Sequence, residues 1–136
     1  MFAAIAPFAL GLLLGGMGLF SFLVAPTAFA ALQAEDAGRF VRALFPRYFL
    51  FVAGGAALAA LGLVGANPEL AKLMVAAAAL AVVTRQVLIP RINALRDRHL
   101  AGDAAAGRWF GRLHMASVGI NVATMGAAAV AFALHV

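Results

Sequence analysis

Four apolar runs, each long enough to cross a lipid bilayer, divide this sequence of 136 residues. They cover residues 2–32, 48–66, 69–89 and 110–134, and about 20 apolar residues span the hydrocarbon layer as a helix. Because lipid cannot hydrogen-bond an open backbone, such runs must be helical. Short connections make neighbouring helices antiparallel. The sequence therefore predicts an all-α fold, in which residues 1–136 form one integral membrane domain, a four-helix bundle.

Composition narrows the class of protein further. The chain is 65% hydrophobic and 11% charged, whereas a soluble domain is about half apolar and about a quarter charged. The net charge of +5 comes from arginines that flank the apolar runs, so we expect a lipid bilayer and no nucleic acid as partner. Another copy of the chain or another membrane protein is a further partner to consider. Cysteine is absent, which excludes disulfides, thiolate catalysis and cysteine metal sites.

The basic residues are distributed unequally between the two sides of the membrane. On the side of the connection between the second and third runs, the only basic residue is Lys72, near the start of the third run. The other two connections carry eight arginines: Arg39, Arg42, Arg47, Arg91, Arg96, Arg98, Arg108 and Arg112. Cytoplasmic loops are enriched in Lys and Arg, so this asymmetry places both arginine-bearing connections in the cytoplasm and both termini outside. A bacterial cytoplasmic membrane is the location this predicts.

Local signals predict where the helices begin, bend and approach one another. Residues 33–47 have an apolar side and are expected to lie along the interface before the second span begins at Tyr48. Pro26 should kink or end the first helix. Asn67 or Pro68 is suited to start the third helix, and Asp103 is suited to cap the start of the fourth. The small-xxx-small spacing of Gly11–Gly15 would allow close helix approach.

A polar stripe in the last apolar run gives the first candidate site. His114, Ser117, Asn121 and Thr124 lie within roughly an 80° arc of a helix. Polar side chains facing hydrocarbon are costly, so the stripe should face other helices or a small cavity. One interpretation makes His114, Asn121 and Ser117 a ligand-binding site. The other makes them interhelical hydrogen-bonding groups, with Ser117 and Thr124 bonding back to their own helix.

Arg85 is the deepest charge in the sequence, near the end of the third run. Its long side chain could reach the nearby interface, or it could remain buried and face the bundle. In the second case, the predicted site is a pocket that opens inward, with His114 as ligand or proton donor and Arg85 nearby. These residues are the ligand-binding candidates.

Several segments carry a resemblance to a known family. In the first half they are Ala25–Phe29, Ala37–Phe40 and Phe45–Phe49. In the second half they are Ile89–Asp97 and Phe110–Ser117, followed by Asn121. Together they resemble the transmembrane protein 205-like family, also described as domain of unknown function 4149. The resemblance implies a four-helix integral membrane protein without an established activity. The chain is also distantly similar in fold to the copper-resistance protein D and membrane protoporphyrinogen oxidase groups, some of which hold haem.

Three functional hypotheses follow. The first is a small binding or accessory bundle with a polar site around His114. The second is a haem-binding membrane oxidoreductase, in which His114 would ligate haem b because it is the only histidine inside an apolar run. Met17 and Met125 would be the second-ligand candidates. The third is a transporter or channel subunit that works as an oligomer. Apart from Glu69 at the very start of the third run, no carboxylate lies within a run, so we expect a binding protein rather than an enzyme, and the identity of any metal stays open.

Overall fold

Four helical spans account for nearly all of the computed structural model, which describes residues 4–136. Each span is long and apolar enough to cross a membrane, and the described residues contain no strand, which confirms the predicted all-α class. The spans are built from α1 (Ile5–Gly18), η2 (Leu19–Val24) and α2 (Ala25–Ala31); α3 (Ala34–Leu63); α4 (Pro68–Val83), η3 (Thr84–Leu88) and α5 (Ile89–Leu100); and α6 (Ala104–His135).

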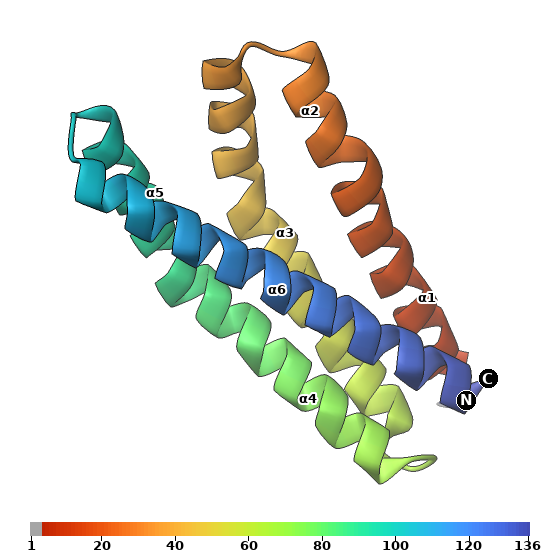
Figure 1. Cartoon of the computed structure of the whole chain (residues 1–136). Coiled ribbons are helices and arrows are strands. Elements are labelled where there is room, and N and C mark those ends of the chain that lie inside the picture. The colour runs from red at the N-terminus through yellow and green to blue at the C-terminus, as the bar shows by residue number, and fades with distance from the viewer. Residues whose placement is uncertain (1–3) are drawn as a thin grey trace.

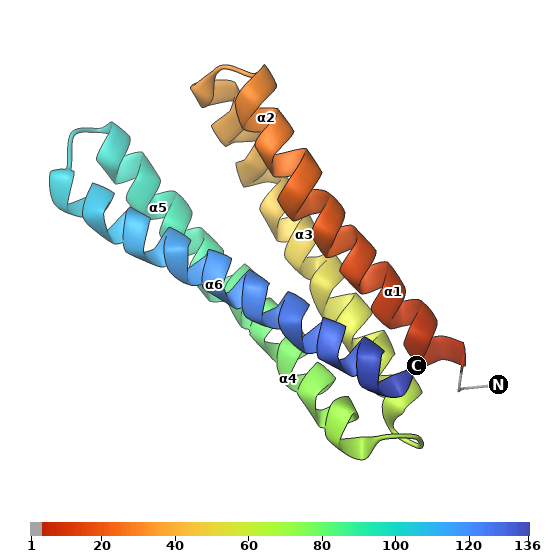
Figure 2. The same cartoon turned by 45° about the vertical axis from the view of Figure 1, so that its right-hand side comes forward.

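The spans form two antiparallel hairpins, shown in Figures 1 and 2. The N-terminal hairpin runs from α1 to α3, and the C-terminal hairpin runs from α4 to α6. The hairpins come together near the chain termini and diverge toward the α2–α3 and α5–α6 connections (Figures 1 and 2). Those connections carry most of the arginines. The diverging half is therefore where side chains from both hairpins can enclose space.

Small residues allow the closest helix contact, between α1 and α3. A Cβ atom added to Gly62 would lie 2.6 Å from the backbone nitrogen of Ala6. By contrast, a Cβ at Gly15 would meet nothing within 4 Å, and one at Gly11 would reach only Phe132, at 3.9 Å. The close approach predicted at Gly11–Gly15 thus occurs at Gly62 instead. Without a hydrophobic driving force in lipid, such tight packing contributes much of the attraction between helices.

The first arginine-bearing connection is shorter than predicted. α3 begins at Ala34 and runs without interruption to Leu63, so residues 33–47 do not form a separate interfacial segment. Ala37 and Val41 are buried, which shows that this part of α3 already packs within the protein. Pro46 lies inside α3 and lacks the N–H that would bond to the Arg42 carbonyl, yet the helix continues.

The first and third spans each contain a π-helical turn just before a proline. η2 precedes Pro26 and η3 precedes Pro90, and each proline is the second residue of the α-helix that follows. In both turns the closing N–H bonds to a carbonyl five residues earlier, from Ala25 to Phe20 and from Ile89 to Thr84. A proline leaves a carbonyl without its α-helical donor, and a wider turn accommodates the loss. The first span therefore continues to Ala31 instead of ending at Pro26.

The predicted starts of the third and fourth helices are confirmed, with Asn67 as N-cap before Pro68 and Asp103 as N-cap of α6. The Asn67 side chain accepts a hydrogen bond from the Leu70 N–H at 3.2 Å, and the Asp103 side chain accepts one from the Ala106 N–H at 3.0 Å. The Asp103 carboxylate also pairs with Arg98 at 2.7 Å. The hydrogen bond from Ala106 and then this arginine lower the pKa of Asp103, because both stabilise its charged form.

Candidate functional site

The polar stripe of α6 faces the interior of the bundle. Ser117 and Thr124 are 6% and 5% exposed, and His114 and Asn121 are half-buried. Ala123, on another face of the helix, is exposed. The structure thus keeps the stripe away from lipid, as its helical spacing predicts.

Asn121 joins three of the four spans through two hydrogen bonds. The Tyr48 hydroxyl of α3 donates to Asn121 Oδ1 at 2.6 Å. Asn121 Nδ2 in turn donates to Ser21 Oγ of η2 at 3.1 Å. Tyr48 is 6% exposed, and its ring stacks on Phe20 with the ring centroids 4.0 Å apart. This arrangement holds the Asn121 amide in one orientation between the hairpins.

Sequence reasoning missed Tyr48 and Ser21 as members of this site. Tyr48 resembles an interfacial aromatic residue at the start of an apolar run, and Ser21 is one hydroxyl among many apolar neighbours. Their separations from Asn121, 73 and 100 residues, leave no local signal of contact. One usable clue was present, because a hydroxyl inside a membrane span commonly needs a partner on another helix or on its own backbone.

A cavity of about 370 Å³ lies beside Asn121, between η2–α2, α3 and α6. Small-molecule sites commonly measure about 300–1,000 Å³ and combine apolar walls with a few polar groups. This cavity has that character, because five phenylalanines and four polar side chains line it. The phenylalanines are Phe20, Phe22, Phe29, Phe45 and Phe49. The polar residues are Ser21, His114, Ser117 and Asn121.

His114 and Ser117 differ in how they meet this cavity. The Ser117 hydroxyl donates to the His114 carbonyl of its own helix at 2.7 Å, so its only proton is already used. The His114 ring stacks on Phe110, with centroids 5.8 Å apart. Within residues 4–136 no side-chain hydrogen bond engages that imidazole. His114, Asn121 and Ser21 therefore retain hydrogen-bond donors for a ligand, whereas Ser117 can only accept.

Arg85 lies elsewhere. Its Nε donates to the Pro46 carbonyl at 3.0 Å and its Nη1 to Gln86 Oε1 at 2.7 Å, so it faces α3 rather than reaching away from the bundle. It lines a different cavity, between α3 and the η3–α5 segment. The structure thus brings three predicted site residues to one cavity and Arg85 to another, on a neighbouring face of α3.

Neither candidate for a second haem ligand lies opposite His114. Met17 is fully buried in the core, and Met125 lines the same cavity as His114. Met125 is eleven positions after His114 on α6, about 16 Å along the helix, so the two cannot ligate one iron from opposite sides. The described residues contain no group of three or more His, Cys, Asp or Glu that could hold a metal ion.

Comparison with known proteins gives one match. A family model described as a domain of unknown function, number 4149, matches residues 8–101, which is more than half of the chain. The match covers the first three spans and ends before α6, the helix that carries His114 and Asn121. No curated protein and no solved structure matches the chain, so the distant likeness to the two haem-associated groups gains no support.

Proposed function

The chain belongs to the family of domain of unknown function 4149, and we propose that it is a membrane-embedded binding protein for a lipid-soluble molecule. The observation that carries this proposal is the aromatic cavity beside Asn121, with its polar groups at the wall formed by α6 and η2. Four apolar spans make the protein an integral membrane protein, so such a ligand would reach the cavity from the bilayer.

The chemistry of the cavity wall defines the class of ligand. The five phenylalanine side chains favour an apolar, preferably aromatic, body. The Asn121 amide has two N–H groups, and Ser21 accepts a hydrogen bond from one of them. The second can donate to a carbonyl or ether oxygen of the ligand, and the His114 imidazole can donate or accept. A lipophilic carbonyl compound therefore fits better than a charged metabolite.

Photolabelling with benzophenone tests this proposal, because that aryl ketone is apolar, accepts a hydrogen bond and forms covalent bonds on illumination. We expect labelled peptides to contain residues 20–29, 41–49 and 114–125, which border the cavity. A Val118→Trp variant should block labelling, because Val118 lines the cavity. Ala123→Trp, on an exposed face of the same helix, is the control. The proposed site would be disproved if Val118→Trp left the amount of labelling unchanged, or if labelling spread evenly over exposed residues.

We also propose the orientation predicted by the arginine distribution, with both arginine-bearing connections in the cytoplasm and both termini outside. Because the chain has no cysteine, a thiol reagent can label only the single cysteine that is introduced. A cysteine at exposed Ala104 should resist an impermeant thiol reagent in intact cells, and one at exposed Ala66 should react. The reverse labelling pattern would reverse the orientation.

A further inference from the structure

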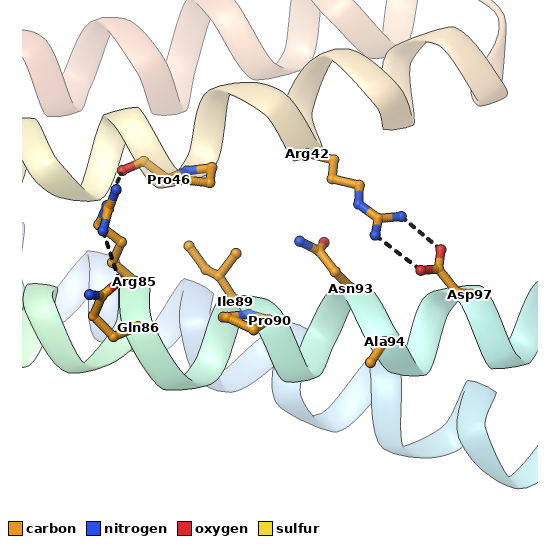
Figure 3. A pocket seen from close by; sticks show the side chains of 9 residues that line it. All are labelled: Arg42, Pro46, Arg85, Gln86, Ile89, Pro90, Asn93, Ala94 and Asp97. Atoms are coloured by element: carbon orange, nitrogen blue, oxygen red, sulfur yellow. Dashed lines mark hydrogen bonds and ion pairs between the residues drawn. The ribbon is translucent and has the colours of Figure 1, made fainter.

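A second cavity, of about 450 Å³, lies between α3 and the η3–α5 segment. Figure 3 shows Pro46 and Arg85 at one end, Arg42 and Asp97 at the other, and Asn93 between them. This cavity is distinct from the aromatic one, and five of its nine lining residues carry polar side chains. The complete lining consists of Arg42, Pro46, Arg85, Gln86, Ile89, Pro90, Asn93, Ala94 and Asp97.

The charges at this cavity are unbalanced. Arg42 and Asp97 form a two-pronged ion pair, with nitrogen–oxygen distances of 2.7 and 3.0 Å, so they neutralise each other. Arg85 adds a positive charge that no carboxylate of residues 4–136 contacts. Nearby on the same side of α5, the Arg96 guanidinium packs against Gly38 of α3. The cavity therefore carries a net positive charge.

The protein cannot supply the missing anion from its own carboxylates. The sequence contains only five Asp and Glu residues, and each pairs with another basic residue. Those carboxylates belong to Glu35, Asp36, Glu69, Asp97 and Asp103. The Pro46 carbonyl and the Gln86 amide that Arg85 contacts are neutral, so its positive charge in a membrane span stays uncompensated, which suggests a counter-ion from outside the chain.

Arg85 also retains hydrogen-bond donors. A guanidinium has five N–H groups, and the Pro46 carbonyl and the Gln86 side chain accept from two of them. The contacts to Pro46 and Gln86 fix the plane of the guanidinium. The Asn93 amide points into the space between the two ends of the cavity (Figure 3). Together these side chains present several donors from fixed positions.

We propose that this cavity binds an anionic phosphate group, which Arg85 and Asn93 hold through charge-assisted and neutral hydrogen bonds. Phosphate matches the planar, multidentate donor geometry of arginine. The lining residues of the cavity come from the halves of α3 and of the η3–α5 segment that lead to the arginine-bearing connections. Basic pockets between helices near the membrane surface bind lipid headgroups. The phosphate can come from an anionic lipid or from free phosphate in the cytoplasm.

Native mass spectrometry of the full chain in detergent tests the proposal. The probes are phosphatidylglycerol, zwitterionic phosphatidylcholine and inorganic phosphate. We expect phosphatidylglycerol to bind at least about tenfold more tightly than phosphatidylcholine, because choline would bring a cation toward Arg85. Displacement of bound lipid by inorganic phosphate would identify the free anion as the ligand. Retention of the lipid would identify the headgroup.

Matched substitutions complete the test. Arg85→Gln should weaken phosphatidylglycerol binding about tenfold, whereas Arg91→Gln, an exposed arginine of α5, should leave it unchanged. If Arg85→Gln does not fold, Asn93→Ala should still weaken binding without removing a charge. Equal affinity for both lipids without binding of inorganic phosphate, or equal effects of the Arg85 and Arg91 substitutions, would overturn the proposal.

Discussion

Replacing Asn121 with leucine should destabilise the bundle more than any other single change in the polar stripe. The substitution removes the hydrogen bonds from Tyr48 and to Ser21, which link three spans. Hydrogen bonds between membrane helices contribute about 0.6 kcal/mol each on average, so their loss costs about 1.2 kcal/mol. The buried Tyr48 hydroxyl is also left without an acceptor, which adds about 1–3 kcal/mol. The total expected loss is about 2–4 kcal/mol.

A second substitution separates these two contributions. Tyr48→Phe removes one hydrogen bond together with its donor, so alone it should cost about 0.6–1 kcal/mol. When Tyr48→Phe is combined with Asn121→Leu, the buried hydroxyl that would lack an acceptor is no longer present. The double variant should therefore cost at least about 1 kcal/mol less than the sum of the single variants.

Reversible unfolding in mixed micelles, with SDS as denaturant and circular dichroism as signal, measures each free energy of unfolding. Ala123→Leu is the matched control, because Ala123 is exposed on the same helix and points about 160° away from Asn121. It should change the free energy of unfolding by less than about 0.5 kcal/mol. Strict additivity of the Tyr48 and Asn121 substitutions, or equal losses for Asn121→Leu and Ala123→Leu, would refute the reasoning.

Three further outcomes follow from the structure. Gly62→Ala should destabilise by about 1–3 kcal/mol in the same unfolding assay, because its Cβ would meet the Ala6 backbone, whereas Gly54→Ala, with open space, should be neutral or stabilising. Asp103→Ala should lower the free energy of unfolding through loss of its N-cap, and in the unsubstituted protein this contribution should fade only at acidic pH, as pH falls through the lowered pKa of Asp103. In cells supplied with haem, any visible absorption band of the purified protein should vanish in His114→Ala, and a band that survives would exclude His114 as the ligand.

Much of the fold could be predicted from the sequence because its determinants are local. The number of spans depends on runs of apolar residues, and helix starts depend on one capping side chain and the backbone three residues later. The inward direction of the α6 stripe follows from helical periodicity and the cost of placing polar groups in lipid. The absence of disulfides and the unequal distribution of arginines between the connections can likewise be read from the sequence alone.

The tertiary structure decided which of these residues meet. No local pattern pairs Asn121 with Tyr48 and Ser21, which lie 73 and 100 residues away in the sequence. Their contact depends on how the two hairpins pack against each other. The same packing separated Arg85 from His114, since neighbouring faces of α3 line different cavities. The structure also showed that α3 continues through Pro46 and that π-helical turns precede Pro26 and Pro90. In lipid every long apolar run becomes a helix, but only side-chain packing between helices sets their rotation and register, and thus the lining of each cavity.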